Sequence, residues 1–88
     1  MRKTSLAIAA VLATIVSVEP AMAESCYDLW YERNSIYDAN GYCFTTTLGR
    51  QTFDNSDCYT KRARLSADEQ WRVDQIQEEE ARRGCNVN

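Results

Sequence analysis

Four cysteines are the residues of this chain whose number and spacing predict the clearest chemistry: Cys26, Cys43, Cys58 and Cys85. An all-thiolate metal site is disfavoured, because no two of them form the close C-x-x-C pair typical of such sites. The same spacing argues against a thioredoxin-like redox role. An even number of cysteines in an oxidising compartment instead predicts two disulfides.

The second candidate for chemistry is a pair of opposite charges, Arg33 and Glu80, each on the apolar side of a predicted helix. This pair has two interpretations. In the first, it is a binding or catalytic site in which Arg33 holds a carboxylate ligand and Glu80 acts as a base. In the second, which we favour because the two residues face each other between helices, it is a structural ion pair that locks the register of the helices. The chain has no histidine, so Ser–His pairs, Cys–His pairs and ordinary zinc sites are ruled out. We expect no catalytic residue, no cofactor and no metal ligand.

Three further residues are candidates for binding: Asn34, Tyr31 and Trp71. Trp71 falls opposite the apolar stripe of its helix, and Tyr31 lies at the edge of the other helix. Exposed rings of this kind are suited to dock a sugar or a peptide, whereas a Trp71 covered by the middle loop has only a packing role. We expect Asn34 to hydrogen-bond to the backbone of the loop over residues 42–57.

An oxidising compartment is indicated by the first 23 residues, which have the pattern of a secretory signal peptide. Arg2 and Lys3 form a charged start, an apolar run follows over residues 6–18, and Ala21-Met22-Ala23 is an A-x-A cleavage site. Cleavage there predicts a mature domain of residues 24–88, exported to the periplasm or the extracellular medium. The apolar run is too short to span a bilayer, so we expect no membrane span.

Two helices must position the candidate residues, one from residue 27 to about 40 and one from residue 67 to about 83. The first begins at a capping box of Ser25 and Asp28 and ends at Asn40-Gly41. The second begins at a capping box of Ser66 and Glu69 and ends at Gly84. Between them, residues 42–64 show no sustained period, and we expect an irregular loop with a short helical turn around residues 48–53. The predicted fold class is mostly α, a small disulfide-stapled domain of two antiparallel helices plus this loop.

The cysteine pairing follows from the helix direction. Pairing Cys26 with Cys43 is disfavoured, because the first helix separates them by about 20 Å at 1.5 Å per residue. Pairing Cys26 with Cys85 needs antiparallel helices, whereas pairing Cys43 with Cys85 needs parallel ones. Only the antiparallel register brings Arg33 to the level of Glu80, and buried charges need partners. We therefore predict Cys26–Cys85 and Cys43–Cys58.

The charge balance excludes one class of partner. Without the predicted signal peptide the chain keeps eight basic and twelve acidic side chains, a net charge of about −4. A net acidic chain without a basic stripe is a poor candidate for binding nucleic acid. The cluster Lys61, Arg62 and Arg64 is interpreted here as a solvated segment before a helix.

The stretch from Leu29 to Phe44 resembles the YARHG domain, a small bacterial extracytoplasmic module. The matching residues are Arg33-Asn34, Tyr37, Gly41, Tyr42, Phe44, Leu65-Ser66, Ile76 and Glu80. Asp38-Ala39-Asn40 replace the Ala-Arg-His in the middle of the family's motif, so an activity that rests on that Arg and His does not carry over. The resemblance is closest to small cysteine-containing relatives, and it implies a role at the cell envelope or in ligand binding.

The sequence therefore predicts a small exported, non-catalytic module that binds a cell-envelope component or another protein. The alternative is a small secreted hydrolase or hydrolase inhibitor that acts around Arg33, Asn34 and Glu80. A third possibility is a secreted toxin-like effector. The state of Arg33 discriminates between them: a paired Arg33 disfavours the enzyme, and an Arg33 that opens to a cleft beside Tyr37 favours it.

Overall fold

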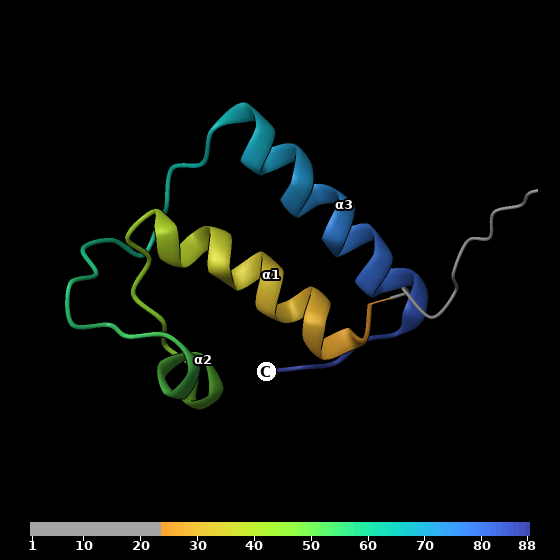
Figure 1. Ribbon diagram of the computed structural model, residues 1–88, viewed down its shortest axis with the longest axis horizontal. Coiled ribbons are helices and arrows are strands. Elements are labelled where there is room, and N and C mark those ends of the chain that lie inside the picture. The colour runs from red at the N-terminus through yellow and green to blue at the C-terminus, as the bar shows by residue number, and fades with distance from the viewer. Residues whose placement is uncertain (1–23) are drawn as a thin grey trace, which may run out of the picture.

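The computed structural model describes residues 24–88, and the predicted signal peptide over residues 1–23 lies outside this part of the chain. Three helices follow one another in the order α1 (Cys26–Ala39), α2 (Thr47–Thr52) and α3 (Ala67–Arg83). The two long helices, α1 and α3, pack against each other in antiparallel directions, and α1 lies between α3 and α2 (Figure 1). This arrangement confirms the predicted mostly α fold class.

Both long helices begin at reciprocal capping boxes. The Ser25 hydroxyl accepts a hydrogen bond from the Asp28 backbone amide at 3.0 Å, while the Ser25 amide donates to the Asp28 carboxylate at 3.3 Å. Ser66 and Glu69 repeat the pattern at the start of α3. Each box satisfies amides that a helix N-terminus otherwise leaves without partners, which explains why local sequence alone places these boundaries.

The apolar core has two parts, one on each side of α1. Between the long helices, Val73 and Ile76 are completely buried and Leu29 is 3% exposed. On the side of α2, the buried rings of Trp30, Phe44 and Phe53 form an aromatic cluster, and Val87 of the C-terminal tail packs against it. Burying each large apolar side chain contributes about 2 kcal/mol, so α1 is held from both sides.

Two disulfides staple this small core. Cys26 is joined to Cys85 and Cys43 to Cys58, with Cα–Cα distances of 5.4 and 5.0 Å. The first bond links the start of α1 to the second residue after the end of α3, as antiparallel helices require. The second closes the segment that carries α2. This is the pairing that the register of the helices predicts.

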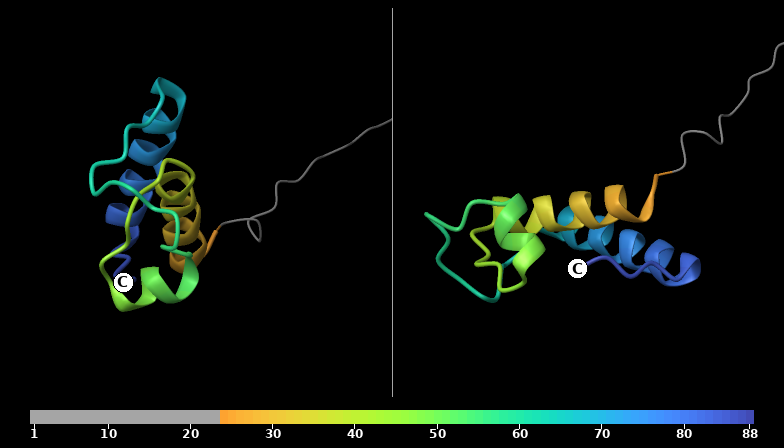
Figure 2. Two further views of the ribbon diagram at one scale, coloured as in Figure 1. Left: turned by 90° about the vertical axis from the view of Figure 1, so that its left-hand side faces the viewer. Right: turned by 90° about the horizontal axis from the view of Figure 1, so that it is seen from below.

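The segment after α1 is held by backbone contacts around Gly41. The Gly41 carbonyl accepts hydrogen bonds from the amides of Tyr59 and Thr60 at 2.9 and 3.1 Å, and the Cys43 amide donates to the Thr60 carbonyl at 2.7 Å. Asn55 adds a pair of bonds from its side chain to the amide and the carbonyl of Phe44. Residues 42–60 therefore form a fixed segment, in which α2 lies beside α1 and the stretch after α2 extends past the C-terminal end of α1 (Figure 2).

Gly41 is a position where this loop requires a glycine. Its φ is +81°, and a Cβ placed on it would lie 2.1 Å from the nearest ring carbon of Tyr59. Gly84 also has a positive φ, +66°, but a Cβ there meets no atom within 4 Å. A substitution at Gly84 therefore carries only the cost of the left-handed backbone, whereas one at Gly41 carries that cost and a steric clash.

We expect Gly41→Ala to lower the free energy of unfolding by more than Gly84→Ala does. Gly84→Ala costs about 1 kcal/mol for the left-handed backbone alone. Gly41→Ala adds the displacement of the Tyr59 ring to the same backbone cost. Chemical denaturation of the oxidised domain measures the difference, and equal losses in the two variants would show that the Tyr59 ring does not hold the turn.

Candidate functional site

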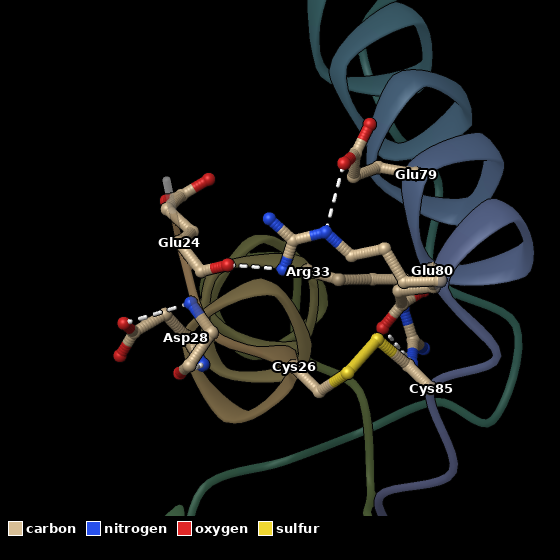
Figure 3. Close-up of a disulfide and its surroundings, with 9 residues drawn as sticks. Glu24, Cys26, Asp28, Arg33, Glu79, Glu80 and Cys85 are labelled. Carbon is tan, nitrogen blue, oxygen red and sulfur yellow. Dashed lines mark hydrogen bonds and ion pairs between the residues drawn. A yellow bond between two sulfur atoms is a disulfide. The ribbon is translucent and has the colours of Figure 1, made fainter. Parts of the chain in front are cut away.

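Arg33 is closed off by a bidentate ion pair. Its Nε donates to Glu80 Oε1 at 2.9 Å and its terminal amine to Glu80 Oε2 at 3.1 Å, and the two side chains are 21% and 14% exposed. The pair lies beside the Cys26–Cys85 disulfide (Figure 3). Both oxygens of the Glu80 carboxylate accept from Arg33, so Arg33 is in the paired state that disfavours the enzyme. The pairing removes the observation on which the hydrolase alternative depended.

Asn34 does not do what its sequence context suggests. It is 8% exposed, and its side-chain amide donates to the Trp30 carbonyl one turn earlier in α1, at 2.9 Å. The side chain that bonds to both the amide and the carbonyl of Phe44 in this loop is that of Asn55. The Asn34 side-chain amide is thus bonded within α1 and not to the loop. Its burial also disfavours direct contact with a ligand.

The two candidate aromatic residues are exposed but lie in different surroundings. Tyr31 is 46% exposed, and its ring centroid lies 5.3 Å from that of Phe53, next to α2. Trp71 is 63% exposed and lines a shallow depression with other α3 residues, namely Asp74, Gln75, Gln77 and Glu78. The middle loop does not cover Trp71. The structure therefore provides two separate aromatic positions and not one continuous patch.

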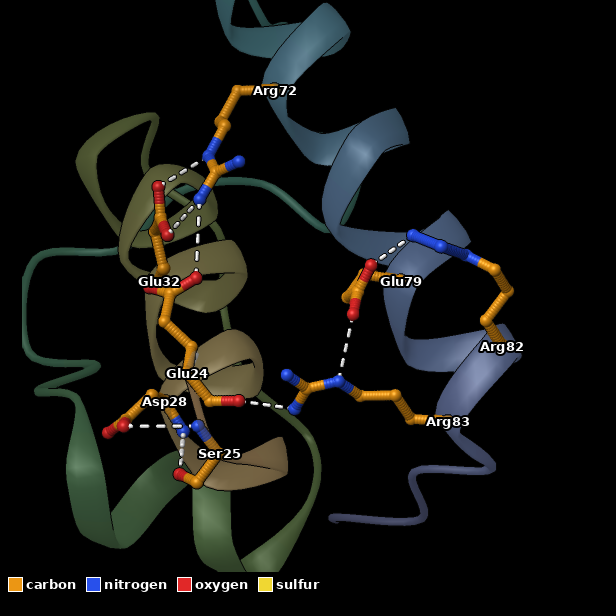
Figure 4. Close-up of polar contacts among 8 residues, drawn as sticks. All are labelled: Glu24, Ser25, Asp28, Glu32, Arg72, Glu79, Arg82 and Arg83. Atoms are coloured by element: carbon orange, nitrogen blue, oxygen red, sulfur yellow. Dashed lines mark hydrogen bonds and ion pairs between the residues drawn. The ribbon is translucent and has the colours of Figure 1, made fainter. Parts of the chain in front are cut away.

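A polar network on the α1–α3 surface joins residues that the sequence did not connect. Arg72 donates to both oxygens of Glu32 at 2.6 Å, and it lies 3.6 Å from the Glu24 carboxylate. Glu79 accepts from Arg82 and Arg83 within α3, and Arg83 also donates to the Glu24 carbonyl (Figure 4). A helical wheel places Glu32 on the solvent side of α1, so only the reach of a long arginine side chain from α3 explains the contact.

This network changes the protonation behaviour of its members. Hydrogen bonds from the Arg72 guanidinium hold the pKa of the Glu32 carboxyl below its usual value. The same contact raises the pKa of Arg72 above its already high value. Both shifts favour the charged pair over the neutral groups.

Acid is expected to weaken the link between the helices at Glu32. The pKa of Glu32 is lowered in the folded domain, so its stabilising contribution is complete above the pKa of an unfolded glutamate, near 4.5. That contribution is lost as the pH falls through the lower folded-state pKa. Melting temperatures between pH 7 and pH 2 should therefore fall less steeply in Glu32→Gln than in the unchanged domain, and Glu78→Gln serves as the control. Identical slopes in all three proteins would contradict the assignment.

Two further concave surfaces occur on the described chain, and one of them contains this network. An open groove of about 690 Å³ is lined mostly by the charged network, including Arg72, Glu79 and Arg83. A smaller groove of about 330 Å³ lies where α1 ends, lined by Asn40, Tyr59, Thr60, Arg62 and Arg64. Within residues 24–88 no cluster of three or more metal-ligating side chains occurs. In the same part of the chain, no helix has both the length and the apolarity needed to cross a membrane.

A family model of the YARHG domain matches residues 5–81 of this chain, which covers all of α1 and α2 and most of α3. The chain belongs to the YARHG domain family. Membership suggests a small extracellular module. No curated protein and no solved structure matches the chain. Two of the residues that match the YARHG pattern have a clear structural role: Gly41 adopts a positive φ, and Glu80 pairs with Arg33.

Proposed function

We propose that this YARHG domain is an exported, non-catalytic module that binds a component of the cell envelope, either a glycan or another protein. The observation that carries the proposal is the exposure of four large aromatic side chains on so small a stapled scaffold. Tyr27, Tyr31, Tyr59 and Trp71 are between 45% and 77% exposed. Exposed tyrosine and tryptophan offer broad apolar contact with few rotatable bonds, which is typical of binding surfaces.

Export is supported by three independent features. The first 23 residues have the pattern of a secretory signal peptide. All four cysteines are joined in disulfides, and such bonds persist in the periplasm or outside the cell. The family match suggests an extracellular module. We propose residues 1–23 as the cleaved segment and residues 24–88 as the mature domain.

A non-catalytic role is supported by the state of the polar side chains. The partly buried charges Arg33 and Glu80 bind each other, and Asn34 is occupied within its own helix. Arg33 and Glu80 are therefore proposed as a structural ion pair that sets the distance between α1 and α3. A hydrolase needs a nucleophile and a base that reach the substrate, and these residues do not supply them.

Sedimentation of the oxidised domain with insoluble envelope material of its source organism tests the proposal. We expect saturable binding that Trp71→Ser weakens while the melting temperature stays within about 2 °C of the unchanged domain. Arg33→Gln serves to probe the enzyme alternative, because it removes that alternative's central residue. Turnover of envelope material that Arg33→Gln abolishes, or the absence of any saturable binding, would overturn the proposal.

A further inference from the structure

We propose that the groove at the C-terminal end of α1 binds an acidic sugar of an envelope glycan, with a carboxylate or phosphate held by Arg62 and Arg64 and the sugar ring against Tyr59. This inference rests on the proposed function and names its ligand class. The groove is formed by three parts of the chain that the fold brings together: the residue that caps the end of α1, the end of the middle loop and the segment that leads into α3.

The first argument is charge that has no partner. Residues 59–66 carry Lys61, Arg62 and Arg64 and no acidic residue, although the domain as a whole is net acidic. Among residues 24–88, the ion pairs of basic side chains involve Arg33, Arg72, Arg82 and Arg83. No basic residue of the 59–66 segment takes part in them. A local excess of positive charge on an acidic protein attracts anions to one place.

The second argument is the type of cation. Two arginines line the groove, and a guanidinium presents its donors as a planar fork that matches carboxylate and phosphate oxygens. The Glu69 carboxylate near the groove stays charged, because hydrogen bonds from the Ser66 amide at 2.9 Å and from the Asn40 side chain at 3.2 Å lower its pKa. Neither Arg62 nor Arg64 forms an ion pair with it or with any other carboxylate of residues 24–88, so an incoming anion does not have to displace an internal partner.

The third argument is the exposed ring. Tyr59 is 77% exposed, the largest exposure among the big apolar side chains of the described chain, and it forms one wall of the groove. An apolar ring face beside polar groups suits a sugar, which has both C–H faces and hydroxyl edges. The volume of about 330 Å³ is at the lower end for small-molecule sites and accommodates one or two sugar units.

The groove is also held in shape before a ligand arrives. The Tyr59 and Thr60 amides donate to Gly41, and the Arg62 amide donates to the Thr60 hydroxyl at 2.9 Å. The Cys43–Cys58 disulfide ends one residue before Tyr59. Binding to a wall that is already fixed avoids part of the entropy cost of ordering a loop.

The larger groove is the less suitable anion site, although it also contains arginines. Arg72 is paired with Glu32, and Arg83 with Glu79. Glu24 and Glu78 add two further carboxylates to its lining. An anion there has to displace existing ion pairs and approach uncompensated negative charge, so Arg82 in that groove provides a matched control for Arg62 and Arg64.

The test is titration of the oxidised, isotope-labelled domain, followed by amide NMR, with oligosaccharides of equal length. Tetragalacturonate carries a carboxylate on each ring, a phosphorylated maltotetraose carries phosphate, and unmodified maltotetraose is neutral. We expect one of the two acidic sugars to shift the amides of residues 59–64 and 40–41, and the one that does identifies the anion. We expect the double variant Arg62→Gln with Arg64→Gln to bind that sugar at least about tenfold more weakly, while Arg82→Gln binds it as the unchanged domain does.

Each other outcome counts against the groove. If neutral maltotetraose or inorganic phosphate alone shifted the same amides equally, the groove would not require both the sugar ring and the anionic group for binding. Binding only to vesicles that contain phosphatidylglycerol would point to a membrane surface instead. An unaffected double variant, with a melting temperature equal to that of the unchanged domain, would exclude the two arginines. If envelope material still binds when the acidic sugars do not, the groove assignment fails and the proposed function stands; if neither binds, both fail.

Discussion

Replacing both Cys26 and Cys85 with serine is expected to lower the free energy of unfolding by about 4 kcal/mol. The bond closes a loop with a sequence separation of 59 residues, and removing it restores that freedom to the unfolded chain. It also releases the two ends of the helix pair. Domains of this size have little stability to spare, so we expect the double variant to be largely unfolded at 37 °C.

Urea denaturation followed by circular dichroism measures this loss. The double variant Cys43→Ser with Cys58→Ser is the matched control, because it removes a loop with a separation of only 15 residues and should cost about 3 kcal/mol. The control should also loosen the 42–60 loop while α1 and α3 keep their contact. A Cys26/Cys85 variant as stable as the unchanged domain would mean that helix packing alone holds α1 against α3.

Glu80→Gln is expected to lower the free energy of unfolding by about 2 kcal/mol, because Arg33 keeps its partly buried position and loses its charged partner. The carboxylate that accepts two hydrogen bonds becomes an amide that accepts through one oxygen. The desolvated guanidinium is then left undercompensated, and that penalty exceeds the ordinary value of a surface ion pair.

Glu79→Gln is the control one residue away. Glu79 also contacts arginines, but it does so within α3 on the outer surface, where such pairs contribute about 0.5 kcal/mol or less. Replacing both Arg33 and Glu80 with methionine should recover most of the stability that Glu80→Gln loses, since no charge remains buried. Equal melting temperatures for Glu80→Gln and the unchanged domain would exclude Arg33–Glu80 as the contact that sets the helix register.

The helices and their direction were accessible from sequence because short-range signals define them. Ser25 and Ser66 begin the long helices through capping boxes that involve only residues three positions apart. The direction follows from requiring partners for Arg33 and Glu80, which both lie on apolar stripes. The structure places these two side chains in contact, with the Cys26–Cys85 bond beside them.

The parts that sequence did not reveal depend on side-chain reach and on the path of the loop. Glu32 lies on the outer side of α1 by helical periodicity, yet the long Arg72 side chain crosses from α3 to bind it. Asn34 is polar and was expected at the loop, but burial on α1 turns its amide back to Trp30. The groove with Arg62 and Arg64 forms only because the loop returns to Gly41, a contact between residues 18 or more positions apart along the chain.

The claim on which the fold, export and the binding groove all rest is that the exported chain loses its signal peptide and forms both disulfides. Intact mass of the protein exported to an oxidising compartment, with non-reducing peptide mapping, tests it most directly. We predict a chain that begins at Glu24, lighter than its reduced form by four hydrogen atoms, with Cys26 linked to Cys85 and Cys43 to Cys58. Free thiols, a lipid on Cys26, or a Cys43–Cys85 link would contradict the account.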